Sequence, residues 1–262
     1  MNTTQPLNGR HALVTGGSRG IGFAVAQRLA GLGARVTLMG RDADALDEAA
    51  GRLGAQAQAG FVRADIAQRT QVVQAFAQAK AAFGAIDILV NNAGQAESQR
   101  FDRIDEDAWQ RMIAVNLSGT FHCMQAALPD MLEGKWGRIV NVASTAGLVG
   151  YAYVGAYCAA KHGVVGLTRA LAQEVARKGI TVNAVCPGYT ETDIVLGAIE
   201  NIVNKTGVSA DQARATLAQR NPQGRLVQPS DVAQAVAWLC LPAAESINGQ
   251  ALPVDGGEVM AG

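Results

Sequence analysis

Several kinds of residue are scarce in this 262-residue chain, and each scarcity argues against a class of protein. The 22 basic and 22 acidic residues cancel, so net charge steers the chain to neither nucleic acid nor an anionic membrane surface. Only three histidines occur, far apart in sequence, and no metal-ligand spacing is present, so we expect no metal site. No apolar run is long enough to span a bilayer.

Cysteine is also scarce. No CxxC pair occurs, which favours reduced, mostly buried thiols over disulfides or a metal site. The four cysteines are Cys123, Cys158, Cys186 and Cys240. Residues 1–8 are polar and lack the apolar core of a signal peptide, so we expect a cytoplasmic protein.

Apolar runs and helical patterns alternate along the chain, which favours an α/β fold. The expected strands cover residues 10–15, 35–40, 60–64, 86–91, 137–143, 180–186 and 250–254. The expected helices cover residues 20–32, 42–53, 68–83, 105–132, 155–178 and 230–240. After a flexible N-terminus (1–8), we predict a single doubly wound Rossmann-type domain over 9–262, with a mostly parallel seven-stranded sheet.

One long irregular stretch, 188–229, follows the sixth expected strand and includes an expected helix near 192–204. Long loops in compact domains are usually functional, so we interpret this stretch as a substrate lid. The alternative is an ordinary surface excursion.

A glycine-rich loop with Gly16, Gly20 and Gly22 joins the first expected strand to the first helix. Strand, glycine loop and helix are the context of a dinucleotide site. Glycines let the backbone approach a pyrophosphate, and the helix N-terminus offers it unpaired N–H groups. The spacing differs from the common G-x-G-x-x-G, and such a loop alone also serves as a plain turn.

A second pattern is a tyrosine followed by lysine four residues later, Tyr157 and Lys161, with Ser144 thirteen positions upstream. Residues at i and i+4 share one helix face, so the ammonium group should lie beside the phenol and lower its pKa. A tyrosine tuned in this way can exchange a proton near neutral pH. The pair alone also occurs by chance on surface helices.

Together these features resemble the short-chain dehydrogenase/reductase family, over nearly the whole chain. The matching segments stand in the family's order: residues 15–22, Asp65, 91–94, Asn116, Ser144, Tyr157 with Lys161, 187–188 and 254–257. The resemblance implies reversible hydride transfer between a nicotinamide cofactor and a carbonyl or secondary alcohol. It makes Asn116, Ser144, Tyr157 and Lys161 the catalytic residues. Tyr157 would protonate the alkoxide, Ser144 would stabilise negative charge, and Asn116 and Lys161 would relay protons.

The resemblance also implies the cofactor contacts. These fall on the glycine loop and the strand ends: Gly16, Ser18, Arg19, Gly20, Ile21, Gly22, Arg41, Asp65, Ile66, Asn92, Ala93, Gly94, Tyr157, Lys161, Pro187, Gly188, Thr190 and Thr192. Members of the family that use NAD place an acidic residue at the end of strand two, where this chain has Gly40. Glycine leaves room for a 2′-phosphate, and Arg19 and Arg41 can pair with it, so we predict NADP. The alternative is that Asp42 reaches the ribose and selects NAD.

The substrate is less well defined by the sequence. The chain resembles 3-oxoacyl reductases that bind an acyl carrier protein, since it has an apolar lid and carries Lys135 and Lys178 where those enzymes have basic residues that contact the carrier. We therefore expect a 3-oxoacyl or 3-hydroxyacyl thioester, carried on acyl carrier protein or coenzyme A, or a similar apolar ketone. The alternatives are an NAD-dependent dehydrogenase of a small secondary alcohol or hydroxy acid, and a non-catalytic nucleotide sensor. The family also implies a homotetramer, or at least a homodimer.

Overall fold

A wholly parallel sheet of seven strands, in the order β3-β2-β1-β4-β5-β6-β7, forms the centre of the molecule. The computed structural model describes residues 5–54 and 57–260. The strands are β1 (His11–Thr15), β2 (Arg35–Gly40), β3 (Ala59–Arg63), β4 (Ile88–Asn91), β5 (Gly137–Val142), β6 (Ile180–Pro187) and β7 (Ala251–Val254). The predicted fold class is confirmed, with no antiparallel pair in this sheet.

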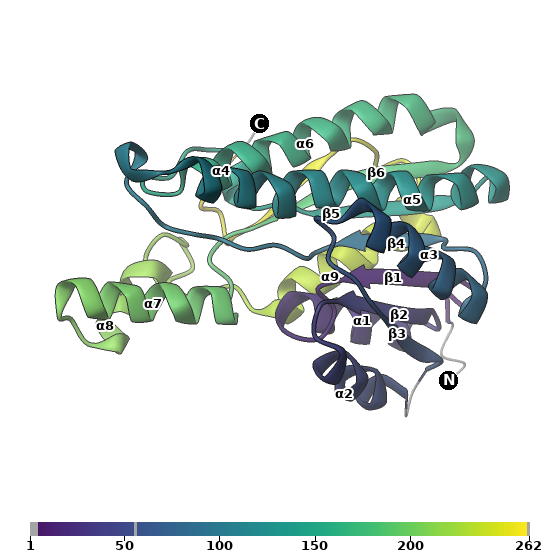
Figure 1. Ribbon diagram of the computed structural model, residues 1–262, viewed down its shortest axis with the longest axis horizontal. Coiled ribbons are helices and arrows are strands. Elements are labelled where there is room, and N and C mark those ends of the chain that lie inside the picture. Colours follow the sequence, from purple (N-terminus) through teal and green to yellow (C-terminus); the bar gives the residue numbers. More distant parts are fainter. Residues whose placement is uncertain (1–4, 55–56, 261–262) are drawn as a thin grey trace.

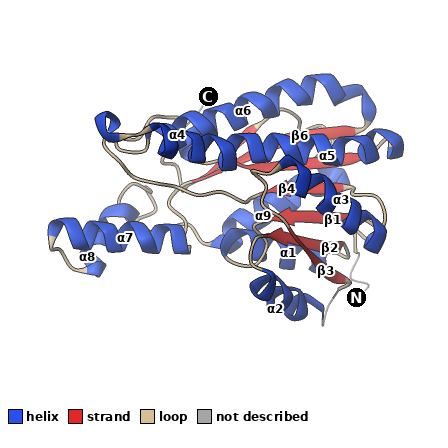
Figure 2. Ribbon diagram, viewed as in Figure 1, coloured by secondary structure: helices blue, strands red, loops and turns tan. Residues whose placement is uncertain are grey.

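Helices cover both faces of the sheet (Figure 1, Figure 2). They are α1 (Gly20–Gly31), α2 (Ala43–Gly54), α3 (Arg69–Phe83), α4 (Glu106–Ile113), α5 (Gly119–Gly134), α6 (Gly155–Val175), α7 (Asp193–Thr206), α8 (Ala210–Ala218) and α9 (Pro229–Cys240). Buried side chains of α1, α2 and α9 form one apolar cluster with the sheet. Those of α3, α5 and α6 form another on the opposite face. Strands buried on both sides in this way read as continuous apolar runs.

The helix expected over 105–132 is interrupted. Its middle, Ala114–Ser118, is a turn of π-helix between α4 and α5. π-turns inside α-helices are frequently found at functional sites. This one holds Asn116, a predicted catalytic residue.

The lid stretch is more ordered than the sequence indicated. It contains α7 as expected and also α8, which the sequence analysis did not predict. An isolated parallel bridge between Thr190 and Val227 brings together residues near its two ends. The lid therefore forms a lobe of two helices with its own small apolar cluster, which stands apart from the sheet in Figure 1.

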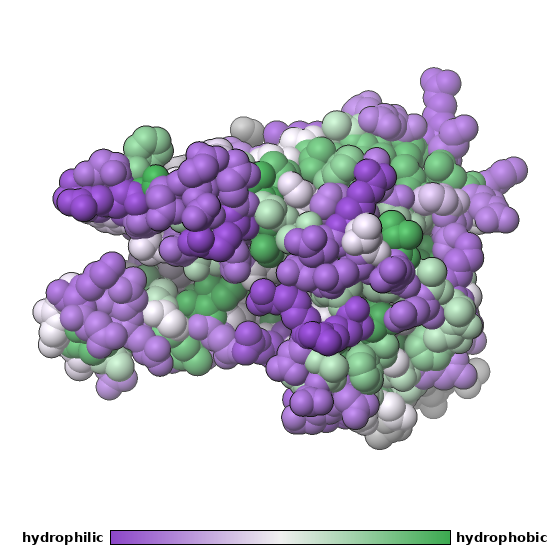
Figure 3. All heavy atoms as spheres, in the orientation of Figure 1, coloured by the Kyte–Doolittle hydropathy of each residue, from purple (hydrophilic) through white to green (hydrophobic). Residues whose placement is uncertain are grey.

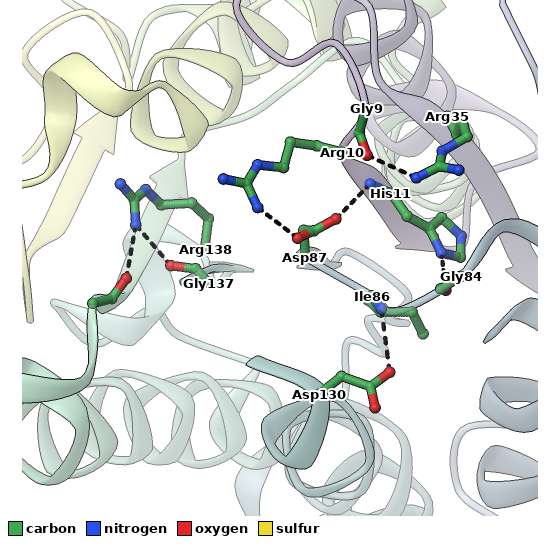
Figure 4. Close-up of polar contacts among 11 residues, drawn as sticks. Gly9, Arg10, His11, Arg35, Gly84, Ile86, Asp87, Asp130, Gly137 and Arg138 are labelled. Atoms are coloured by element: carbon green, nitrogen blue, oxygen red, sulfur yellow. Dashed lines mark hydrogen bonds and ion pairs between the residues drawn. The ribbon is translucent and has the colours of Figure 1, made fainter. Parts of the chain in front are cut away.

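Polar contacts tie together the amino ends of the strands, the edge opposite the predicted site (Figure 4). Arg10 Nη1 pairs with Asp87 Oδ1 at 2.8 Å, and the His11 backbone N–H donates to Asp87 Oδ2 at 2.9 Å. The His11 ring is buried between Gly84 and Thr37, and this burial lowers its pKa. These contacts give His11 a structural role.

The N-terminal segment is packed against the domain from residue 7 onward. Leu7 is fully buried and its N–H donates to Leu32 O, so the predicted flexible N-terminus does not extend to residue 8. Residues 1–4 lie outside the described part of the chain.

Within the described part, no helix is long and apolar enough to cross a membrane, and no cluster of metal-ligating side chains occurs.

Candidate active site

The glycine loop lies at the carboxyl ends of β1 and β4 and is held there by Asn92. The Asn92 amide donates to Thr15 O and Gly16 O at 3.0 and 3.1 Å, and Thr15 Oγ1 accepts from the Asn92 and Ala93 N–H groups. Gly16 has φ +62°, which favours glycine. A Cβ at Gly22 would overlap Gly16 O and lie 2.5 Å from Asn92 Nδ2. The loop is therefore close-packed, with its backbone exposed to a ligand at the N-terminus of α1.

Gly22→Ala is expected to disrupt this loop, because neither the Gly16 carbonyl nor the Asn92 amide can move without breaking their hydrogen bond. We expect a loss of about 1–3 kcal/mol in unfolding free energy, the usual cost of overpacking, together with weaker binding of the expected dinucleotide. Gly31→Ala is the matched control in the same helix, because nothing lies within 4 Å of its added methyl group. Thermal unfolding and NADPH titration of both variants measure the difference. Equal NADPH affinity in the two would contradict this account.

The start of the lid contacts the same loop. Thr192 Cγ2 would lie 3.4 Å from a Cβ on Gly20, and Arg19 Nη1 forms a 3.0 Å ion pair with Asp193 Oδ2 at the first turn of α7. Both charged side chains are well exposed, so the pair adds little stability. The predicted contacts Arg19, Gly20 and Thr192 are thus neighbours in the structure.

Three groups surround the end of β2, where cofactor preference is expected to be set. Asp42 Oδ1 accepts from the Ala45 N–H and thereby holds the first turn of α2. Arg63, at the end of β3, is paired with Gly40 in the sheet register, and its Nε donates to Arg41 O at 3.0 Å. The sequence analysis missed Arg63 because only the strand pairing brings it beside Gly40. Asp42 is engaged with its own helix, whereas Arg41 and Arg63 are both exposed.

Asp65 and Ile66, the predicted adenine contacts, follow β3. Asp65 Oδ1 accepts from the Ala67 N–H, which fixes the turn. Ile66 is 6% exposed and packs so tightly against α5 that a Cβ on Gly119 would lie 2.7 Å from its Cδ1. Only a small part of the Ile66 side chain is therefore left to contact a ligand.

Asn116 is fully buried in the π-turn and clamps the segment after β4. Its Nδ2 donates to Gln95 O and Met112 O at 3.0 and 3.1 Å, and its Oδ1 accepts from the Gln95 N–H at 3.1 Å. A Cβ on Gly94 would lie 2.8 Å from Asn116 Oδ1 and 3.6 Å from Lys161 Nζ. Gly94, Asn116 and Lys161 therefore meet at one place, as the resemblance implied.

Lys161 is 5% exposed and carries its charge into the interior. Its Nζ donates to Val142 O at 2.9 Å and lies 5.6 Å from the centre of the Tyr157 ring. Burial lowers the pKa of Lys161 to about 8, because no carboxylate compensates the lost hydration. The ammonium form still predominates at pH 7.

Tyr157 and Ser144 face each other, and their chemistry differs in one respect from the sequence prediction. Ser144 Oγ accepts from the Ala146 N–H at 3.1 Å, and its hydrogen bond with Tyr157 lowers the tyrosine pKa. Burial has the larger and opposite effect, and it raises the pKa of Tyr157 to about 12. The prediction that Lys161 lowers this pKa below its usual range was therefore wrong for this arrangement. Desolvation outweighs the ammonium group, which lies over the ring and donates to a carbonyl.

The end of β6 completes the site. Thr190 Oγ1 donates to Gly188 O at 3.0 Å, and Thr192 Oγ1 donates to Thr190 O at 3.2 Å. These bonds fix the backbone that leaves Pro187 and enters the lid. The predicted residues from β1, β4, β5, β6, α6 and the π-turn thus gather at the carboxyl edge of the sheet, where ligands bind in such folds.

Known proteins are similar to this chain in sequence and in fold. The family model described as short chain dehydrogenase matches residues 10–220. The chain belongs to the short-chain dehydrogenase family. It is 39% identical to the D-beta-hydroxybutyrate dehydrogenase of Cupriavidus necator, over 97% of this chain and 99% of the relative. It is 38% identical, over the same shares, to the 3-oxoacyl-[acyl-carrier-protein] reductase FabG of Vibrio cholerae.

A solved structure is also similar to this chain, in fold as well as in sequence. A variant of the actinorhodin polyketide ketoreductase, determined with NADPH, superimposes with a TM-score of 0.92 at 39% identity, over 95% of this chain and 97% of that one. As a short-chain dehydrogenase, the protein is an oxidoreductase that acts on hydroxyl or keto groups and binds a nicotinamide dinucleotide. The glycine loop fits such a group, because Gly16 and Gly22 let its backbone pack against the segment after β4. No side chain caps the N-terminus of α1, so its N–H groups can bind a pyrophosphate.

One set of predicted residues lies elsewhere. Lys135 follows α5 and Lys178 follows α6, so both precede the amino ends of β5 and β6. The six residues of β5 separate them from Ser144 by about 20 Å at 3.3 Å per residue. Within one chain, these lysines do not border the site.

Proposed function

We propose that the protein is an NADP(H)-dependent oxidoreductase that interconverts 3-oxoacyl and 3-hydroxyacyl compounds. The observation that carries the reaction class is the convergence of Asn116, Ser144, Tyr157 and Lys161 beside the glycine loop. A sensor without turnover would have no use for a buried, uncompensated lysine next to a tyrosine and a serine. The experiment is a panel of ketones, oxo acids, oxo thioesters and secondary alcohols, run with both cofactors and followed by absorbance of the reduced nicotinamide.

The cofactor supplies the hydride, and the chain's own residues supply the proton and the electrostatics. Tyr157 is protonated across the neutral range, since its pKa is about 12, and it would donate a proton to the alkoxide oxygen. Ser144 would donate a hydrogen bond to the same oxygen and stabilise its developing charge. The positive charge of Lys161 would stabilise the phenolate that remains. Asn116, through Gln95, holds the segment after β4 in place.

The preference for NADP rests on the end of β2. Gly40 presents no carboxylate, and Asp42 is engaged with α2. The Arg63 guanidinium is held against the Arg41 backbone, and both arginine side chains are exposed. Guanidinium groups bind phosphate through two parallel, charge-assisted hydrogen bonds. An adenosine 2′-phosphate at this point would meet both groups, and Arg19 projects from the adjoining glycine loop.

Arg41→Ala is expected to raise KM for NADPH at least ~10-fold more than KM for NADH, because a charge-assisted bond to phosphate is lost. The effect should shrink at high salt. Arg63→Ala should act in the same direction. Arg177→Ala, which removes a charge from the opposite edge, is the matched control. Steady-state kinetics with both cofactors give the ratio, and a wild-type preference for NADH would overturn the proposal.

A carrier protein bound at Lys135 and Lys178 would reach an active site only in an assembly of several copies of this chain. The twofold pairing of α5 and α6 that the family resemblance implies would bring the Lys135 and Lys178 edge of one copy toward the site of the other. Exposed aromatic side chains support such a dimer, since Trp109 on α4 and Phe121 on α5 are 37% and 39% exposed. We propose a homotetramer built from this dimer. The acyl compound would reach the site either as a thioester or as a free acid.

A further inference from the structure

Four side chains from distant parts of the sequence form a polar cluster at the base of the lid. Tyr151 and Tyr189 meet edge to face, with ring centres 6.4 Å apart. Arg220, which follows α8, lies over both rings, with its Cζ 5.2 Å from the centre of Tyr151 and 6.0 Å from that of Tyr189. The Tyr151 hydroxyl donates to Glu258 Oε1 at 2.7 Å. This cluster is polar, whereas the sequence analysis predicted an apolar lid.

The cluster adjoins the reacting groups on two sides. Tyr151 is within hydrogen-bonding reach of Thr145, which follows Ser144. Tyr189 follows Gly188 and is close enough to Tyr157 that a charge on it would shift the Tyr157 pKa. Arg220 therefore contacts the two tyrosines that adjoin the Ser144–Tyr157 pair. Figure 3 shows the open cleft between the lid lobe and the body of the molecule, into which a substrate would enter.

Arg220 is the cation of this region that lacks a carboxylate. Its neighbours on the lid are paired, Arg214 with Glu191 and Arg225 with Asp231. In the part of the chain that the structure describes, Arg220 makes no ion pair. A guanidinium group stacked on aromatic rings is held in place, and the N–H groups at its edge stay free for a planar anion.

We propose that Arg220 is a specificity-determining residue that binds the carboxylate of a short oxo or hydroxy acid whose carbonyl or hydroxyl carbon lies at Ser144 and Tyr157. The inference rests on the proposed function and chooses the free acid over the thioester. The D-beta-hydroxybutyrate dehydrogenase named above takes a substrate with these two groups, which supports the choice.

Glu258 adds a second element of selectivity. Its carboxylate is fixed by Tyr151, and its Oε2 would lie 3.2 Å from a Cβ on Gly188, so it borders the same space. One negative group of the substrate can be neutralised by Arg220, but a second would face Glu258. Like charges in such a site act against the wrong ligand. The pair therefore favours a monoanionic acid over a dianion or a phosphate-bearing coenzyme A thioester.

The test compares 3-oxobutyrate with its ethyl ester, both reduced with NADPH. Arg220→Met should lower the ratio of kcat/KM for the acid to that for the ester at least ~10-fold, through KM, because a charge-assisted bond is lost. Arg220→Lys should lower it less, since charge remains but the bidentate geometry is gone. Lys205→Met, which removes an exposed charge from the end of α7, is the control for net charge on the lid.

The outcomes separate this inference from the proposed function. An unchanged acid-to-ester ratio in Arg220→Met, or a wild-type enzyme that reduces the ester and not the acid, overturns the role of Arg220 and leaves the 3-oxoacyl reductase intact. Failure of the wild type to reduce any ketone of the panel removes both.

Discussion

Replacing Tyr157 with phenylalanine is expected to lower kcat for ketone reduction by at least ~10²-fold while NADPH affinity and the unfolding midpoint stay close to wild type. The change removes only the hydroxyl that gives the proton, and the ring still fills the space beneath Lys161. Tyr153→Phe is the matched control, since that side chain is 63% exposed and belongs to the turn before α6. Near-normal turnover in Tyr157→Phe would contradict the mechanism.

The same residue predicts opposite pH profiles for the two directions. Reduction needs the protonated phenol, which persists up to a pKa of about 12, so its rate should not fall through loss of this proton below pH 9. Oxidation needs the phenolate, so its kcat/KM should rise with pH over the whole accessible range. Rates measured from pH 6 to 10 in both directions provide the check. A plateau for oxidation near pH 7 would mean that the tyrosine pKa in the working enzyme lies far lower.

Lys161→Met is expected to abolish turnover and, at neutral pH, to raise the unfolding midpoint. Burial lowers the pKa of Lys161 from 10.5 to about 8, which at 1.36 kcal/mol per unit corresponds to a penalty of about 3 kcal/mol for keeping the charge. Removing that penalty stabilises the variant, but the lost hydrogen bond to Val142 O reduces this stabilisation by about 1 kcal/mol. A buried charge kept at this cost indicates a functional requirement.

The sign of the pH dependence follows from linkage. Between about pH 8 and 10.5 the unfolded chain binds the Lys161 proton and the folded chain does not, so wild-type stability gains from this group as pH rises. Below pH 8 the penalty is present in full. The advantage of Lys161→Met should therefore be largest at pH 7 and shrink by pH 9.5. Thermal unfolding at both pH values measures this advantage, and Lys205→Met is the exposed control. A difference in unfolding midpoint between Lys161→Met and wild type that does not change with pH would contradict the account.

The sequence predicted the strands most accurately, because their apolar runs and the alternation of strands and helices indicate the same sheet. The strands were predicted to within about two residues, because apolar runs between glycine or polar breaks leave little choice in a doubly wound sheet. The candidate catalytic residues were predicted from the family resemblance, in which the Tyr157–Lys161 spacing was one motif, and in the structure they lie close together. Helix α8 was missed, although Ser209 and Gln212 form a capping box that is visible in the sequence.

What the sequence could not give depends on contacts between distant segments. Arg63 gains its importance only because β3 pairs with β2. The wrong direction for the Tyr157 pKa has a similar origin, since the i, i+4 rule reports proximity but not desolvation. Lys135 and Lys178 precede strands whose direction places them at the opposite edge from the site.

Asn116 is positioned by the π-turn at Ala114–Ser118, an irregularity in the helical hydrogen-bond pattern. A π-turn holds one residue more than an α-helical turn, so deleting a single residue there would restore a regular helix. That shorter helix would be an easier one to form. It would also turn every side chain before the deletion by about 100° relative to those after it, since 3.6 residues make one turn. The enzyme thus preserves an insertion that helix formation alone would eliminate, and length variation in this helix should separate active from inactive relatives more sharply than substitution on its surface.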